Sequence, residues 1–270
     1  MAGQLLIYER AIPVSSERHR EWSVKTGTNY NFANSVNSVP ILAAEFVSAA
    51  RELTIIFAGE NEAIFPAVML GMRDGNNLYV GEDGSWQGKY VPAFLRRYPF
   101  VFALSEDQQT FTLCIDEEFE GCNKDGRGEH MFDADGERTQ YLQTMLNFSR
   151  EYQVQFNRTK QFADRLRELE LFEPAQARFQ LPDGTAASLA GFFTINREKL
   201  KALPGDTLAA MAATDELELC YVHLQSLNNI GLIAQKDVRA QPEETPAETA
   251  PAKPPAKGRN GAAKKKKADA

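Results

Sequence analysis

The sequence predicts an α+β protein in which a curved, mainly antiparallel sheet of the N-terminal half is packed by one long helix. Three observations predict this class. Short apolar, β-prone segments separated by tight turns occupy much of residues 54–115. A long segment after them has apolar residues at helical spacing and contains no proline or glycine. Strand-like and helix-like segments of a smaller α/β C-terminal lobe follow, and the chain ends in a segment with the composition of a disordered tail.

The elements of the N-terminal half follow from their apolar patterns. In Ile41–Leu53 the apolar residues recur every three or four positions, which predicts a helix. Glycine-containing turns such as Asp74-Gly75, Asp83-Gly84 and Asp125-Gly126 separate the segments that follow. The predicted strands are Thr54–Ala58, Ala67–Met72, Asn77–Val80, Phe100–Leu104 and Phe111–Ile115.

The second half is predicted to be mainly helical. Thr139–Leu171 should form one helix, or two with a short break, packed across the sheet. Strands at Arg178–Leu181 and Gly191–Ile195 flank a turn at Pro182-Asp183-Gly184, and helices follow at Thr207–Ala213 and Leu217–Leu232. The last segment is ambiguous, because its first residues also alternate as in a strand, but the helical spacing persists longer and is preferred.

The domain organisation predicted from these elements is one globular domain over residues 1–238. Its 270-residue chain, 43% hydrophobic and 25% charged, has the composition of a folded protein. A division of this domain into two lobes, 1–172 and 173–238, is also compatible with the sequence. The Pro-, Ala- and Lys-rich segment 239–270 contains no aromatic residue and is expected to be disordered.

Charge is distributed unevenly between the body and the tail. The whole chain has a net charge of −7, and residues 241–270 contain seven Lys/Arg and four Asp/Glu, so that the remaining body carries about −10. An acidic body binds nucleic acid and anionic membranes poorly. The Lys264–Lys267 cluster of the tail could contact nucleic acid or an acidic partner, and a solubilising role is the alternative.

A cytoplasmic location is expected. The first residues lack a basic segment followed by 7–15 apolar residues, which a secretory signal requires. The sequence contains no run of about 18 apolar residues, which a membrane-spanning helix requires. The three cysteines, Cys114, Cys122 and Cys220, are odd in number and widely spaced, which favours a reducing compartment over a disulfide framework.

Motifs of common catalytic classes are absent from the sequence. There is no Gly-x-Ser-x-Gly nucleophile elbow, no phosphate-binding P-loop and no dinucleotide-binding Gly-x-Gly-x-x-Gly. Cys114 and Cys220 occur in apolar patterns typical of inert core thiols. Cys122 lies beside Gly121 and Lys124, so it is the cysteine expected to be exposed. We therefore expect no cofactor, and a binding protein rather than an enzyme.

The segment GEHMFDADGE is the strongest candidate for a metal site. It contains Glu129, His130, Asp133, Asp135 and Glu137 within nine residues. An EF-hand loop starting at Asn123 fails, because Arg127 occupies a ligand position and Ala134 replaces the closing glutamate. His130 and Asp133, joined by His19, could hold the metal of an oxygenase-like enzyme. The alternative is a solvated turn before the long helix.

The segment GEDGSWQGKYVPAFLRRYPFVF is the candidate binding cleft. Aromatic side chains beside arginines can bind an acidic or peptidic ligand. The alternative is that the aromatic residues are core and the arginines pair with acidic residues of the body. The candidate residues are Trp86, Tyr90, Arg96, Arg97 and Tyr98.

The same segment resembles the signature of the SapC family of bacterial proteins, in the run NLYVGEDGSWQGKYVPAFLRRYPF. Further similar stretches include Val39-Pro40 with Glu45-Phe46, the GEHMFDADGE loop and FFTINREKLKALP, so that the resemblance covers residues 5–235. The family is named after a surface-layer locus, and it brings no established catalytic residues to carry over.

What the resemblance implies about function is modest, and the binding and metal-enzyme hypotheses rest on the residues described above. A non-enzymatic, cytoplasmic accessory or binding protein that recognises a peptide or acidic ligand is the leading hypothesis. A metal-dependent enzyme using His130 and Asp133 and a surface-layer structural protein are the alternatives. A peptide-permease label sometimes given to relatives does not suit a chain without a membrane-spanning segment.

Overall fold

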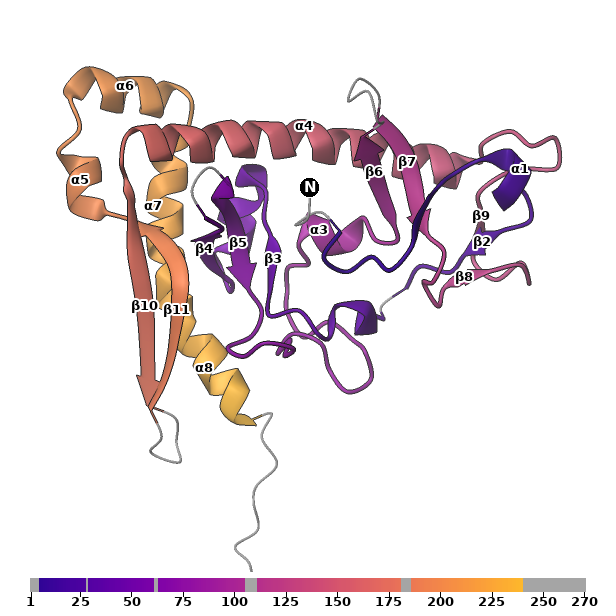
Figure 1. Ribbon diagram of the computed structural model, residues 1–270, viewed down its shortest axis with the longest axis horizontal. Coiled ribbons are helices and arrows are strands. Elements are labelled where there is room, and N and C mark those ends of the chain that lie inside the picture. Colours follow the sequence, from indigo (N-terminus) through magenta and orange to yellow (C-terminus); the bar gives the residue numbers. More distant parts are fainter. Residues whose placement is uncertain (1–4, 28, 61–62, 105–110, 181–185, 240–270) are drawn as a thin grey trace, which may run out of the picture. The chain divides into compact units, whose positions relative to one another are not determined.

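The computed structural model describes residues 5–27, 29–60, 63–104, 111–180 and 186–239, and it confirms an α+β protein with antiparallel sheets and one long helix (Figure 1). The predicted tail, apart from Arg239, and the predicted turn at 182–184 lie outside the described residues. None of the helices in the described part of the chain combines the length and apolar character that a bilayer crossing requires.

The largest sheet has five strands in the order β10-β11-β4-β5-β3. Strands from both sides of residue 172 therefore share one sheet, because Phe193 of β11 pairs with Phe57 of β4. β4 is rich in β-branched residues and is buried along almost its whole length, which is typical of a central strand. The bounds are β3 (Ser38–Pro40), β4 (Thr54–Ala58), β5 (Phe65–Met69), β10 (Phe172–Gln180) and β11 (Ala186–Ile195).

Two smaller sheets of three strands complete the β-structure of the described residues. One has the order β1-β7-β6 and joins a segment near the N-terminus to the β6–β7 hairpin. The other has the order β8-β2-β9 and lies in the half of the molecule that contains α1 (Figure 1). The bounds are β1 (Ala11–Pro13), β6 (Phe100–Leu104), β7 (Phe111–Asp116), β2 (Ser23–Val24), β8 (Cys122–Asn123) and β9 (Glu129–His130).

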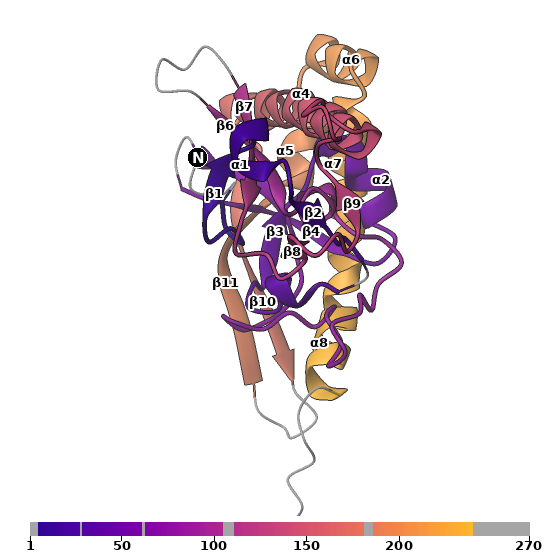
Figure 2. The same ribbon diagram turned by 90° about the vertical axis from the view of Figure 1, so that its right-hand side faces the viewer.

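The long helix α4 (Gln140–Glu168) forms without a break and packs against both the β1-β7-β6 sheet and the five-stranded sheet. The Thr139 side chain accepts a hydrogen bond from the Leu142 amide and so caps the first turn. Leu142 and Leu146 pack into the cluster that covers the β1-β7-β6 sheet. Phe162 and Leu166, about four turns later, pack into the cluster that covers the five-stranded sheet. Figure 1 shows α4 running past both sheets, and Figure 2 shows the same helix nearly end-on.

The remaining helices are short. They are α1 (Ser16–His19), α2 (Phe46–Ala49), α3 (Ala93–Arg96), α5 (Arg197–Lys201), α6 (Gly205–Ala213), α7 (Glu216–Ser226) and α8 (Ile230–Arg239), with 3-10 turns η2 (Asn31–Ala33), η3 (Ala43–Glu45) and η5 (Leu227–Asn229). The preference for helix over strand in Leu217–Leu232 is confirmed by α7, η5 and α8. The segment predicted at Gly191–Ile195 belongs to the longer strand β11, and the described part of the segment predicted at Arg178–Leu181, which ends at Gln180, belongs to β10.

Two predictions for the N-terminal half are wrong. Ile41–Leu53 is not one helix but η3 followed by α2, because the Glu45 carboxylate turns back to accept from the Leu42 amide. Asn77–Val80 is not a strand, and only Val80 forms an isolated bridge, with Trp86. The Asn77 side chain bends the chain there, since its amide donates to the Ala33 carbonyl and its oxygen accepts from the Tyr79 amide.

The core between α7 and the five-stranded sheet contains a buried histidine. His223 is fully buried, and its Nε2 accepts a hydrogen bond of 3.2 Å from the Ile195 amide. Its ring packs edge-on against Phe57 at 5.0 Å between centroids. Burial lowers the pKa of His223 from an ordinary 6.5 to about 4, because the charged ring would lose its hydration.

We predict that this histidine makes stability depend on pH. The unfolded chain binds the His223 proton near pH 6.5 and the folded chain only near pH 4, so its contribution is complete above pH 6.5 and falls as the pH drops toward 4. The free energy of unfolding should fall by roughly 3 kcal/mol over this range, because each unit of pKa difference corresponds to about 1.4 kcal/mol. Urea denaturation of the native chain and of His223→Gln, compared at pH 7 and 4, measures it. A stability difference between the two chains that does not change with pH would contradict the prediction.

Candidate functional site

The first candidate residue of the predicted cleft segment, Trp86, is half buried. The Trp86 Nε1 donates to the Tyr90 carbonyl oxygen at 3.0 Å, which closes the turn between these residues. Its ring stacks on Tyr79 at 5.5 Å between centroids and lies 5.6 Å from Tyr30. One face of the indole is therefore committed to the core, while part of the ring stays accessible.

A buried carboxylate, Glu45, holds the next part of the segment. Its Oε1 accepts from the Tyr90 hydroxyl at 2.6 Å and from the Ala93 amide at 2.7 Å, while its Oε2 accepts from the Leu42 amide at 3.0 Å. Three donors satisfy a side chain that is only 6% exposed. Glu45 thus fastens Tyr90 and the start of α3 to η3. The sequence signal for this role of Glu45 was a charged residue within the apolar run of 41–50.

A second glutamate fixes the backbone just before Tyr90. The Glu52 Oε1 accepts from the Lys89 amide at 2.6 Å and from the Tyr90 amide at 2.5 Å. The Tyr79 hydroxyl donates to the Glu52 carbonyl oxygen at 3.2 Å. Burial and the Glu52 charge raise the pKa of Tyr79 to about 12, so its hydroxyl remains a donor at physiological pH. The segment is therefore rigidly attached on both sides of the aromatic residues.

Two of the predicted cleft residues face the interior. The Arg97 side chain is 2% exposed, and its guanidinium lies over the rings of Tyr152 at 4.4 Å, Phe94 at 4.6 Å and Tyr8 at 5.7 Å. Tyr98 is 8% exposed and stacks on Phe32 at 4.2 Å. Burial raises the pKa of Tyr8 to about 12, an effect that the Arg97 charge opposes. These two residues support the segment from inside.

Arg96 is the exposed member of the predicted site. Its side chain is 45% exposed, its Nε donates to the Val91 carbonyl oxygen at 3.0 Å, and its guanidinium lies 5.5 Å from the centre of the Phe148 ring. The Arg96 charge also opposes the burial-driven rise of the pKa of Tyr30 and of Tyr90. An Arg96 nitrogen lies 4.0 Å from the Glu45 Oε1 that holds Tyr90, so the exposed cation is an ion-pair partner of Glu45 and lies beside the half-buried ring of Phe148. We call the set Tyr30, Trp86, Tyr90, Arg96 and Phe148 the Arg96 patch.

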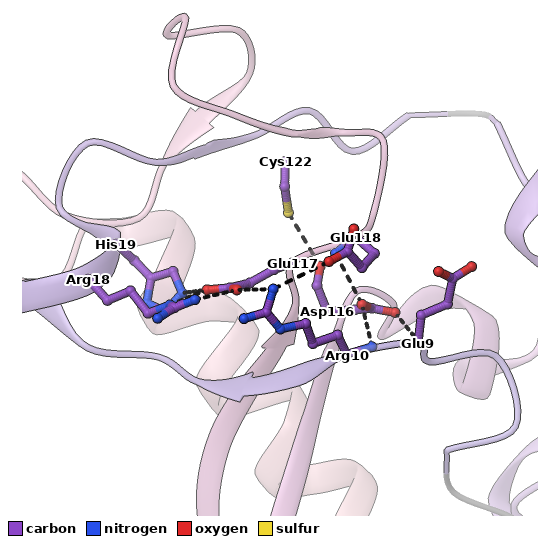
Figure 3. A network of polar contacts seen from close by, with 8 residues as sticks. All are labelled: Glu9, Arg10, Arg18, His19, Asp116, Glu117, Glu118 and Cys122. Atoms are coloured by element: carbon purple, nitrogen blue, oxygen red, sulfur yellow. Dashed lines mark hydrogen bonds and ion pairs between the residues drawn. The ribbon is translucent and has the colours of Figure 1, made fainter.

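A polar network behind these residues was missed by sequence reasoning (Figure 3). Its centre is Asp116, a fully buried carboxylate at the end of β7. One oxygen accepts from the Glu9 amide at 2.8 Å, and the other accepts from the Arg10 amide at 3.0 Å. The Tyr98 hydroxyl donates to the same carboxylate at 3.2 Å, as does the Glu118 amide. Asp116 therefore joins the N-terminal segment, the end of β7 and the predicted cleft segment.

The neighbouring carboxylate, Glu117, binds two side chains of α1. Arg18 donates to both of its oxygens, and the His19 Nε2 lies 3.1 Å from Oε1 (Figure 3). The bidentate Arg18 contact holds the pKa of Glu117 below its usual range. The His19 Nδ1 faces the backbone of Ser15 rather than a nucleophilic hydroxyl. This arrangement ties α1 to the end of β7 and forms no catalytic triad.

The polar groups of the GEHMFDADGE loop form hydrogen bonds that stabilise the loop itself and its contact with β2. The Asp133 Oδ1 accepts from the amides of Asp135 and Glu137, and the His130 Nδ1 bonds the Ser23 hydroxyl at 3.0 Å. His130 and Asp133 line one shallow cavity of about 730 Å³, whereas His19 is bound to Glu117. Within the described ranges, no three His, Cys, Asp or Glu side chains form a group that could hold a metal ion.

The cysteines of the structure are free thiols. Cys114 and Cys220 are buried, and Cys122 is half buried with its thiol directed at the Asp116 carbonyl oxygen at 3.6 Å. Burial and the charges of Asp116 and Glu117 raise the pKa of Cys122 to about 12. A thiol with so high a pKa is a poor nucleophile at neutral pH.

We predict that Asp116→Asn destabilises the protein by roughly 2–3 kcal/mol. Whichever way the amide turns, its NH2 group faces at least one of the backbone donors that the carboxylate now satisfies. Urea denaturation measures the loss, and faster hydrogen exchange at the Glu9 and Arg10 amides locates it. Glu118→Gln is the control, since the Glu118 side chain is 51% exposed. Equal stability of the two variants would show that Asp116 does not have this role.

Comparison with known proteins identifies a family for this chain. No curated protein and no solved structure matched the chain significantly. The model of the family described as SapC matches residues 14–232, which include the Arg96 patch, Asp116 and all of α4. The match covers more than half of the 270 residues. The chain is therefore a member of the SapC family.

Proposed function

We propose that the protein is a non-enzymatic, cytoplasmic accessory protein that binds a peptide or another acidic ligand through the Arg96 patch. The observation that supports the proposal is the exposure of one arginine among half-buried aromatic rings. Trp, Tyr and Arg dominate the binding energy of protein interfaces, because they bury large areas with little loss of conformational entropy. A guanidinium recognises a carboxylate through two parallel hydrogen bonds.

Rigidity of the patch supports the same function. Tyr90 and the backbone around it are held by Glu45 and Glu52, and Trp86 is stacked on Tyr79. A surface whose side chains are already fixed loses little entropy when a partner binds. Arg97 and Tyr98, which a ligand cannot reach directly, contribute by supporting this surface.

The internal bonding of the titratable groups favours binding over catalysis. Asp116 accepts a hydrogen bond from the Glu9 amide, Glu117 binds His19, and His223 is enclosed in the core. The metal-dependent alternative has less support, because His130, Asp133 and His19 have separate partners. Three free cysteines support a reducing compartment, and hence the cytoplasm.

The test is site-specific photo-crosslinking in cells that make the full chain. We predict that a photo-reactive amino acid at Lys89, next to Tyr90, captures a partner, whereas the same group at Lys160 on α4 does not. Arg96→Ala should reduce the Lys89 adduct at least tenfold, because the cation that anchors the carboxylate is lost.

The control is Arg158→Ala, which removes an exposed arginine of α4 outside the patch and should leave the adduct unchanged. Urea midpoints of both variants establish that they are folded. If no adduct specific to Lys89 forms, or if it survives Arg96→Ala, the patch is not the binding surface.

A further inference from the structure

Strand β7 is paired along only part of one of its edges. On one side, β6 pairs with it from Phe111 to Ile115. On the other side, β1 pairs only with the last three residues of β7, from Cys114 to Asp116. The Val14 amide then donates to the Leu113 carbonyl oxygen at 2.9 Å, and the chain turns away into α1. Among the described residues, no strand pairs with Phe111 and Thr112 on the β1 side.

The backbone groups of Phe111 point to this open side. In an antiparallel sheet the N–H and C=O of one residue point to the same neighbour, and the next residue points to the other. Leu113 directs its carbonyl toward Val14 on the β1 side, so Phe111, two residues earlier, directs its N–H and C=O the same way. An unpaired edge of this kind is a template for a further strand.

A groove lies directly beside this edge. A cavity of about 790 Å³ extends between Phe111–Leu113 of β7 and the first half of α4. Leu142 and Leu146 of α4 are buried members of its lining, whereas Phe111 is 47% exposed. A groove beside an open edge offers pockets for alternate side chains of an extended peptide.

The charges of the groove differ from those of the body. Its charged lining residues are Arg138, Arg150 and Glu137, a net charge of +1 on a body of about −10. All three are exposed. A cationic groove on an acidic protein attracts an acidic segment and repels a basic one.

We propose that this groove binds an extended acidic segment of a partner protein, which adds as a strand to the open edge of β7. Main-chain hydrogen bonds to Phe111 fix the segment in register, its apolar side chains contact the accessible Phe111 and Val14, and its carboxylates contact Arg138 and Arg150. The site is separate from the Arg96 patch and does not depend on it. The chain's own segment 241–270, with a net charge of +3, has the wrong sign for the groove.

The experiment selects peptides from a phage-displayed random octapeptide library on the immobilised full chain. We expect enriched peptides in which apolar and acidic residues alternate. Fluorescence anisotropy of the labelled peptides should show at least tenfold weaker binding to the R138E/R150E variant. The matched control is Arg158→Glu, on α4 outside the groove, which should change binding less than twofold. Binding lost only in Arg96→Ala would assign the peptides to the Arg96 patch and overturn the groove.

Two measurements test strand addition itself. Methylating alternate backbone nitrogens of a selected peptide should abolish binding, and the bound peptide should slow hydrogen exchange of the Phe111 amide at least tenfold. The proposal is overturned if no peptide is enriched, if R138E/R150E binds as the native chain does, or if the Phe111 amide is unaffected. Displacement of the peptide by a synthetic 241–270 peptide, or by a second copy of the chain, would give the groove a different occupant and also overturn it.

Discussion

The structure depends on buried carboxylates that accept hydrogen bonds from the backbone. An ionised carboxylate is stable in the interior only when donors replace its lost hydration. Asp116 obtains four such donors and Glu45 obtains three, and in each case two of the donors lie more than 40 residues away in the sequence. Each carboxylate thereby fixes segments that have little regular secondary structure of their own.

The run of residues 77–100, which resembles the family signature, takes its structure from these anchors. Between β5 and β6 the chain forms only one short helix, α3, yet its side chains are well defined by their partners. Glu52 and Glu45 hold the Lys89–Ala93 backbone, while Arg97 lies among three aromatic rings. Packing a cation against π-faces and phenol rings satisfies it without exposing it to water. Arg96, one residue earlier, is consequently the cation that faces outward.

Helix α4 relates the two proposed binding surfaces. Phe148 contacts Arg96, whereas Arg150 lines the groove beside β7. Two residues apart on a helix correspond to a rotation of about 200°, so the two side chains leave α4 on opposite flanks. One rigid helix can in this way present an aromatic patch on one side and a cationic groove on the other. Both surfaces suit acidic partners, and neither requires a reaction.

The sequence by itself determined the class of the fold, the long helix and the strands β4, β6 and β7. These elements depend on local apolar periodicity, which packing only reinforces. It also indicated the segment that contributes Trp86, Tyr90 and Arg96 to the Arg96 patch, because aromatic residues and arginines are adjacent there. Local pattern was misleading in Ile41–Leu53 and Asn77–Val80, where the side chains of Glu45 and Asn77 bond the backbone and redirect it.

Only the tertiary structure decided which of the adjacent arginines is exposed and which is buried. Arg96 and Arg97 are equivalent in sequence, but the α3 turn directs one to the surface and the other toward Tyr8 and Tyr152. The Asp116 network and the open edge of β7 were likewise beyond sequence reasoning. Both arise where chain segments about 100 residues apart meet, and no local pattern records which distant segments will meet.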